Sequence, residues 1–205
     1  MTADLRLIVV TDDELAAPRS TEQVVAACLE AGAPAVQLRD KRSDDGALLG
    51  RARGLRALCA RHGALFFVND RADIALACGA DGVHLGPDDV PPDAVRRVVP
   101  DGFLIGWSTD SARAAAGAAR LGVDYIGCGA VFGTSSKVEA AGERIGPDGL
   151  ARVVAASTVP VVAIGGITPA NAGLALAAGV VGVAAVSALM SAPDPGAVVR
   201  ALLTH

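Results

Sequence analysis

The stretch ALFFVNDRADIALACGADGVHLG at residues 64–86 contains one complete strand–helix–strand unit. A short apolar run at 64–69 ends in polar residues, an Ala- and Leu-rich stretch follows, and glycines precede the next apolar run at 82–86. Strands that alternate with helices imply parallel crossover connections. Nearly continuous apolar strands are typical of a sheet that is covered on both faces.

The same unit recurs along the whole chain. The predicted strands are 5–11, 35–41, 64–69, 82–86, 103–108, 125–129, 160–165 and 182–187, and the predicted helical stretches include 21–31, 46–62, 111–121, 148–157 and 170–178. Eight such units in a chain of 205 residues average about 25 residues each. The chain is therefore compact, near the lower end of the usual length of a barrel. A doubly wound open sheet is the alternative, but regular units without a linker favour closure. We therefore predict an α/β fold, a single-domain (β/α)8 TIM barrel over residues 1–205.

Composition excludes several partners. The chain is 52% hydrophobic with a net charge of −4. Because no basic stripe is present, we expect no nucleic-acid partner. No apolar run is long enough to span a bilayer, and the amino-terminal residues lack the order of a secretory signal, so we expect a cytoplasmic protein without a membrane partner. The cysteines form no CxxC pair and are expected to be buried, reduced thiols: Cys28, Cys59, Cys78 and Cys128.

The second predicted strand carries an anion-binding pattern. Because side chains on a strand alternate between faces, one face carries Gln37, Arg39 and Lys41. The apolar residues between them would pack under helices, so the polar face points into the barrel mouth. Two cations and an amide suit a diphosphate. The alternative is a set of salt bridges on an exposed edge, but a closed barrel has no free edge.

Two aspartates follow neighbouring strands. Asp70 follows the third predicted strand, and Asp89 follows the fourth. Magnesium commonly takes one or two carboxylates together with water and phosphate oxygens, so the pair predicts a Mg²⁺ site beside the cations. Asp88 could serve instead of Asp89, and either aspartate alone could cap a helix or form a turn.

A second anion site is expected after the seventh and eighth strands. Gly165 and Gly166 let backbone N–H groups approach an anion, and Thr168 is a plausible N-cap before Pro169. This region is the recurrent phosphate site of such barrels. The stretch 133–137 could also clamp a phosphate, or form a solvated loop. Two anion sites in one mouth suit transfer between two phosphorylated substrates with diphosphate as leaving group.

Two other residues are expected to be structural. His84 lies inside the fourth predicted strand, where a core role is the default interpretation. Trp107 is the single tryptophan of the chain, and packing is its default role.

Several segments, in the right order, resemble thiamine phosphate synthases: VQLRDK at 36–41, FVND at 67–70, DGVHLGPDD at 81–89, IGWS at 105–108, DYIGCGAVFGTSSK at 124–137, PVVAIGGIT at 160–168 and GVAAVSAL at 182–189. That family condenses 4-amino-2-methyl-5-pyrimidinylmethyl diphosphate with a thiazole phosphate and releases diphosphate. The resemblance therefore implies a TIM-barrel transferase with Mg²⁺ as cofactor and two small-molecule substrates. It leaves open whether the chain forms a homo-oligomer.

The resemblance also assigns residues by motif. The pyrimidine diphosphate would be held by Gln37, Leu38, Arg39, Asp40, Lys41, Asn69, Ser108 and Lys137. The thiazole phosphate would be held by Thr134, Ser135, Ser136, Gly166, Val186 and Ser187, and Mg²⁺ by Asp70 and Asp89.

The family mechanism is dissociative. Diphosphate departs first, and the thiazole nitrogen attacks the resulting methylene cation, so no general base is needed. Catalytic roles would fall to Arg39, Lys41, Ser108 and Lys137.

The sequence departs from the family pattern around the loop after the sixth strand. Gly133 replaces a proline, Asp110 stands where a histidine is common, and 138–144 (VEAAGER) replaces a small, Pro-rich stretch. A thiazole tautomerase-like homologue is one rival hypothesis, but it would use that histidine. A non-catalytic thiamine-precursor binding protein is another, and a phosphosugar isomerase would use only the site after the last two strands.

Overall fold

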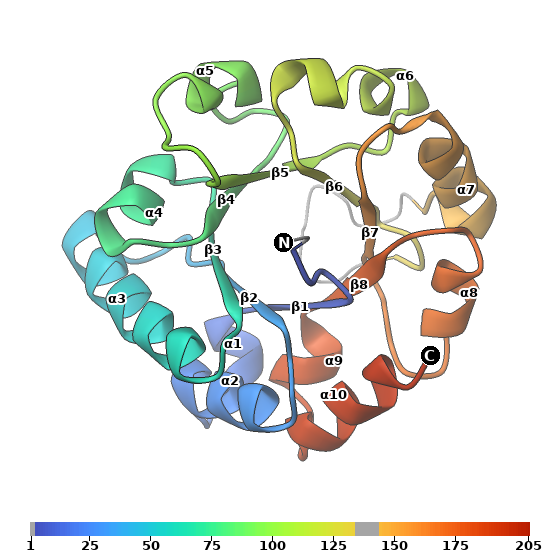
Figure 1. Cartoon of the computed structure of the whole chain (residues 1–205). Coiled ribbons are helices and arrows are strands. Elements are labelled where there is room, and N and C mark those ends of the chain that lie inside the picture. The colour runs from blue at the N-terminus through green and yellow to red at the C-terminus, as the bar shows by residue number, and fades with distance from the viewer. Residues whose placement is uncertain (1–2, 134–143) are drawn as a thin grey trace.

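Parallel strands close into a barrel in which each strand pairs with its neighbours in chain order. The computed structural model describes residues 3–133 and 144–205. The strands are β1 (Leu7–Val10), β2 (Ala35–Leu38), β3 (Leu65–Asn69), β4 (Gly82–Leu85), β5 (Leu104–Ser108), β6 (Tyr125–Cys128), β7 (Val161–Ile164) and β8 (Gly182–Ala185). Figure 1 shows them as a ring with the helices outside. The predicted (β/α)8 barrel is confirmed.

The helices cover the outer face of the ring. They are α1 (Asp13–Ala16), α2 (Thr21–Glu30), α3 (Asp45–Arg61), α4 (Ala72–Cys78), α5 (Pro92–Arg96), α6 (Ala112–Ala115), the 3-10 helix η1 (Ala118–Leu121), α7 (Gly146–Ala156), α8 (Ala172–Leu176), α9 (Ser187–Met190) and α10 (Pro195–Leu203). Side-chain caps fix the starts of several: the Ser20 hydroxyl accepts the Gln23 N–H before α2, and Asp44 accepts the Ala47 N–H before α3.

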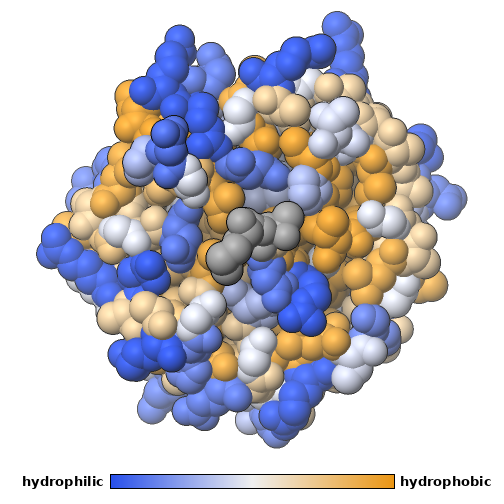
Figure 2. All heavy atoms as spheres, viewed as in Figure 1, coloured by the Kyte–Doolittle hydropathy of each residue, from blue (hydrophilic) through white to orange (hydrophobic). Residues whose placement is uncertain are grey.

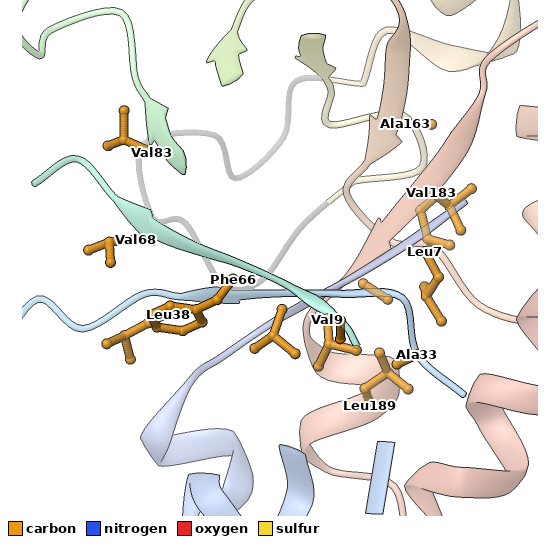
Figure 3. Packing of buried hydrophobic residues seen from close by; sticks show 14 of the residues in the cluster. Leu7, Val9, Ala33, Leu38, Phe66, Val68, Val83, Ala163, Val183 and Leu189 are labelled. Carbon is orange, nitrogen blue, oxygen red and sulfur yellow. The ribbon is translucent and has the colours of Figure 1, made fainter. Parts of the chain in front are cut away.

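Most of the hydrophobic core lies between the strands and the helices. Figure 3 shows strand residues such as Leu7, Leu38 and Phe66 in this layer, and Leu189 of α9 belongs to the same cluster. Each of these side chains is at most 1% exposed. The apolar face predicted for the second strand is thus buried under helices, which leaves Gln37 on the inner face.

A second, smaller cluster fills the inside of the barrel. It includes Leu5, Ile8, Phe67 and Tyr125. The segment before β1 crosses the ring in Figure 1, and Leu5 packs into the cluster at the amino ends of the strands. Figure 2 views this face, where hydrophilic side chains extend around the rim. Open space inside the barrel therefore lies toward the carboxyl ends.

The second strand is shorter than expected, since β2 ends at Leu38 rather than residue 41. Beyond it, the Thr11 hydroxyl accepts the Arg39 N–H at 2.9 Å and donates to the Arg39 carbonyl at 3.2 Å. The Thr11 side chain thus replaces the hydrogen bonds that a neighbouring strand would make with Arg39. Because the strand has ended, its alternation of faces does not predict the direction of the Lys41 side chain.

Two helix predictions also need correction. The stretch 111–121 forms α6 and η1 rather than one helix, with Gly117, a poor helix former, between them. The helix predicted over 170–178 begins at Ala172, so Thr168 is not its N-cap. Instead, the Asn171 side chain accepts the Thr168 N–H and donates to the Gly166 carbonyl, each at 2.8 Å, which holds this segment as a turn.

The described residues contain no helix with the length and hydropathy needed to cross a membrane. All the cysteines are free thiols; Cys28, Cys59 and Cys128 are buried, and Cys78 is half-buried rather than buried as expected. Burial raises the pKa of the three buried thiols to about 12, so they stay protonated near neutral pH.

A buried ion pair anchors the turn after β2. The Asp40 side chain is only 2% exposed and contacts the Arg51 guanidinium, which also binds Asp13. Burial alone raises the pKa of Asp40. The N–H groups of Ser43 and Arg42, the Ser43 hydroxyl and the charge of Arg51 outweigh burial and lower this pKa from 3.8 to about 2.

Asp40→Asn should lower the free energy of unfolding near neutral pH by about 2 kcal/mol, because folding lowers the pKa of this carboxyl and so favours its charged form. That stabilisation is complete above the ordinary pKa of 3.8 and is lost as the pH falls toward about 2. The difference between wild type and variant, measured by urea unfolding, should therefore shrink over that range. Asp101→Asn changes an exposed aspartate and serves as the control. A difference independent of pH would contradict this account.

Candidate active site

A cavity of about 440 Å³ lies at the carboxyl ends of the strands. Many of the sequence-predicted site residues line it together: Gln37, Arg39, Asn69, Ser108, Gly166, Val186 and Ser187. This is the end of the barrel where a βα-barrel places its active site. The residues 134–137 proposed for both substrates, Thr134, Ser135, Ser136 and Lys137, lie outside the described residues.

The polar wall over β2 and β3 is held by direct contacts. The buried Gln37 amide donates from Nε2 to Oδ1 of Asn69 at 2.8 Å. Arg39 lines the cavity, and its Nη1 lies 3.8 Å from Oδ2 of Asp12. Two amides and a guanidinium therefore meet at this wall, with hydrogen-bond donors available to an anion.

Lys41 and Asp70 meet beside this wall, although neither lines the cavity itself. Nζ of Lys41 lies 3.7 Å from Oδ2 of Asp70. Asp70 follows β3 with φ 65°, a left-handed conformation that aspartate adopts more readily than most residues. Such backbone outliers concentrate at functional sites. The pairing of Asn69 with His84 in the sheet places Asp70 next to the end of β4.

Asp89 closes the turn after β4. Its Oδ2 accepts the Gly86 N–H at 2.6 Å, whereas Asp88 is exposed. The turn-forming role that the sequence left open for these aspartates therefore belongs to Asp89. Within residues 3–133 and 144–205, no group of three or more His, Cys, Asp or Glu is placed to hold a metal ion. The assignment of Mg²⁺ to Asp70 and Asp89 therefore stays a prediction from the sequence.

Two side chains assigned to the substrate do not face the cavity. Leu38 is 1% exposed and packs in the outer core, and the Asp40 carboxylate binds Ser43 and Arg51 behind the mouth. The family resemblance assigned both residues by motif; in the structure their side chains make structural contacts.

A hydrogen-bonded chain crosses the floor of the cavity. Nδ1 of His84 lies 3.0 Å from the Tyr125 hydroxyl, and Nε2 lies 2.9 Å from Oγ of Ser108. His84 is 9% exposed and Tyr125 is 1% exposed, and both line the cavity. His84 is therefore buried, as expected of a core residue, but it also lines the cavity, and its Nε2 contacts Ser108, a predicted site residue.

The tautomer of His84 follows from its partners. Burial raises the pKa of the Tyr125 phenol, so Tyr125 keeps its proton. Among the described residues, its hydroxyl hydrogen-bonds only to His84, so we assign it as the donor to Nδ1. Nε2 then carries the imidazole proton and donates to Ser108. The hydroxyl hydrogen of Ser108 is then free to donate into the cavity, which Ser108 lines.

Glycines shape the opposite wall after β7. Gly165 and Gly166 have φ of 95° and 67°, values that other residues rarely adopt. A Cβ on Gly166 would come 2.7 Å from the carbonyl oxygen of Gly133. Together with Ser187 at the start of α9, they line the cavity where the sequence predicts a phosphate.

Among the polar and charged residues that line this cavity, the sequence analysis did not identify Tyr125 and Arg144. Tyr125 begins β6 on the inner face, and alternation from the later residues of the strand could have found it. Arg144 follows a segment without a strand or helix pattern, so its approach to the cavity had no sequence signal.

The comparison with known proteins decides the family. The model of the thiamine monophosphate synthase family matches residues 7–189. The chain belongs to the thiamine monophosphate synthase family. It is therefore an enzyme of thiamine biosynthesis and a transferase. The thiamine phosphate synthase activity expected from the sequence is confirmed by the family and its relatives.

Individual relatives agree. The thiamine-phosphate synthase of Methanospirillum hungatei is 44% identical over 197 residues, which are 96% of this chain and 95% of that protein. A bifunctional thiamine biosynthesis protein of Symbiobacterium thermophilum is 50% identical over 88% of this chain, which spans only 37% of that longer protein. The solved thiamine phosphate pyrophosphorylase from Pyrococcus furiosus has 40% identity and a TM-score of 0.89, covering 98% of this chain and 95% of that one.

Tyr125→Phe should remove the donor that fixes the His84 tautomer. We expect ¹⁵N NMR of the imidazole to show Nδ1 unprotonated in the wild type and partly protonated in the variant. Loss of this buried hydrogen bond should also lower the free energy of unfolding by about 1 kcal/mol. Phe67→Leu is the control, because Phe67 packs edge-on against Tyr125, with ring centroids 5.6 Å apart, and changes packing without changing the donor. A protonated Nδ1 in the wild type would contradict the assignment.

Proposed function

We propose that this chain condenses 4-amino-2-methyl-5-pyrimidinylmethyl diphosphate with thiazole phosphate to give thiamine phosphate and diphosphate. One observation carries the proposal: the polar wall at β2 and β3 and the glycine wall at β7 and β8 line one cavity. Two anionic substrates could thus bind side by side with their reacting atoms between them. We further propose that the enzyme is cytoplasmic and has no nucleic-acid partner.

The diphosphate is proposed to bind at the wall built by Gln37, Asn69 and Arg39, with Lys41 beside it. A guanidinium offers a planar pair of donors, and an ammonium adds a point charge. Ser108 would donate its hydroxyl hydrogen to an acceptor on the pyrimidine diphosphate, because in the tautomer assigned to His84 its oxygen accepts from Nε2. The hydrogen bond from His84 thus orients the Ser108 hydroxyl toward the cavity.

We propose that Mg²⁺ binds the carboxylates after β3 and β4. Asp70 and Asp89 are hard oxygen donors at adjacent strand ends, beside the proposed diphosphate wall. The Gly86 N–H binds one oxygen of Asp89 and orients the carboxylate. When bound there, Mg²⁺ would neutralise charge on the diphosphate oxygens.

The proposed reaction breaks one bond and forms one. The C–O bond between the methylene carbon and the diphosphate breaks, and both electrons leave with the diphosphate oxygen. The thiazole nitrogen then donates its lone pair to the methylene carbon. Arg39 and Lys41 would offset charge that grows on the leaving group, and Lys137 is proposed to join them.

Neither step removes a proton from the nucleophile. A general base is therefore not required, in agreement with a His84 whose Nδ1 is engaged by Tyr125 and whose Nε2 is engaged by Ser108. The rival tautomerase hypothesis would need an acid–base group, and residue 110 is an aspartate here.

The decisive experiment is a diphosphate-release assay with Mg²⁺ and the two substrates, offered separately and together. We expect rapid diphosphate release and thiamine phosphate formation only with both substrates present. A binding protein would take up either ligand and release no diphosphate. A tautomerase would convert a thiazole carboxylate phosphate tautomer without the pyrimidine, and that outcome would reject the proposal.

Asp70→Asn should lower turnover at subsaturating Mg²⁺ by at least about tenfold, since loss of a ligand should exceed loss of a supporting contact. Asparagine is chosen because it tolerates the left-handed backbone at this position, where φ is 65°. The control is Asp101→Asn, which changes an exposed aspartate outside the cavity lining. Steady-state rates over a range of Mg²⁺ concentrations measure the effect. Equal losses in both variants would reject Asp70 as a ligand.

A further inference from the structure

Arg144 lines the active-site cavity on the side of β6 and β7. The residues after it are bonded to the segment that follows β6, because the Ile145 N–H donates to the Ala130 carbonyl at 3.0 Å and the Gly146 N–H donates to the Val131 carbonyl at 3.2 Å. The chain at Arg144 is thereby fixed next to the cavity by backbone hydrogen bonds.

The guanidinium of Arg144 lies against Gly133. A Cβ on Gly133 would come 2.9 Å from Nε and 3.4 Å from Cζ of Arg144, so a side chain at residue 133 would displace the Arg144 side chain from its present position. Gly133 in turn approaches Gly166, since a Cβ on Gly166 would come 2.7 Å from the Gly133 carbonyl oxygen. Arg144 is therefore next to the glycine wall that also includes Ser187.

Arg144 and Arg39 differ in whether a carboxylate lies near the guanidinium. Among the described residues, these are the arginines that line the cavity. Arg39 has the carboxylate of Asp12 at 3.8 Å, whereas no acidic group of residues 3–133 and 144–205 lies within 4.0 Å of Arg144. In the closed strand order, β2 and β6 are on opposite sides of the ring, so the two positive charges are on opposite walls.

We infer that Arg144 binds the phosphate of the thiazole substrate against the wall of Gly166 and Ser187. A guanidinium can donate two parallel hydrogen bonds to phosphate oxygens, and its charge matches that of a phosphate monoester. The inference rests on the proposed function, because it assigns one residue to one of the two proposed substrates. It also gives the altered segment 138–144 a purpose: its last residue supplies the cation for the second anion site.

One consequence concerns substrate choice. If Arg144 contacts the phosphate, it contributes to the binding of thiazole phosphate and not to that of the corresponding thiazole alcohol. Arg144 is thus a specificity-determining residue, distinct from the cations at the diphosphate wall.

The test measures binding and turnover in Arg144→Ala and Arg144→Lys. By isothermal titration calorimetry, Arg144→Ala should raise the Kd for thiazole phosphate at least tenfold and leave the Kd for the thiazole alcohol unchanged. Arg144→Lys should recover part of the loss, since it restores charge without the planar fork. In steady-state assays, KM should rise for thiazole phosphate and stay within twofold for the pyrimidine diphosphate. Arg152→Ala is the matched control, because Arg152 is an exposed arginine of α7 outside the cavity lining.

Three outcomes would overturn the inference: an unchanged Kd for thiazole phosphate in Arg144→Ala, an equal loss for phosphate and alcohol, or a wild type that does not bind thiazole phosphate. Failure of the proposed function has a different signature. In that case the wild type releases no diphosphate with both substrates, while calorimetry still reports whether thiazole phosphate binds through Arg144.

Discussion

Closure of the sheet confines every second strand side chain to one narrow interior, and the site depends on how that space is divided. Glycine at two inward positions makes the division possible. A Cβ on Gly106 would come 2.3 Å from Cζ of Tyr125, and one on Gly127 would come 2.8 Å from Cε1 of His84. Because β5 and β6 omit these side chains, a phenol and an imidazole fit beneath the mouth and support Ser108. The apolar cluster around Leu5 and Phe67 fills the opposite end, so the cavity is left at the carboxyl ends.

Charges around the mouth fall into two groups. Arg51 contacts Asp40 and Asp13 behind the turn after β2. Because the Asp40 side chain is buried, its carboxylate would be costly to leave unpaired. Lys41 and Asp70 meet at the edge of the mouth instead, and their separation of 3.7 Å is too long for a tight hydrogen bond. The first group stabilises the backbone from which the second group projects.

The reaction proposed for this cavity does not require a group that transfers protons. Separation of diphosphate from carbon needs positive charge and exclusion of water, both of which a preorganised polar wall can supply. His84 is consistent with that requirement, since Tyr125 and Ser108 engage both of its ring nitrogens and make it a fixed donor.

The sequence by itself determined the barrel, because alternating apolar strands and helices with short connections leave few other ways to bury both faces. It also placed Gln37, Asn69 and Ser108 at the strand ends that line the cavity, since strand position specifies height in a barrel. Only the tertiary structure decided the direction of side chains beyond the strand ends. There Asp40 turns away to Arg51, and Arg144 approaches Gly133. Contacts between residues distant in the chain set these directions, and no local periodicity encodes them.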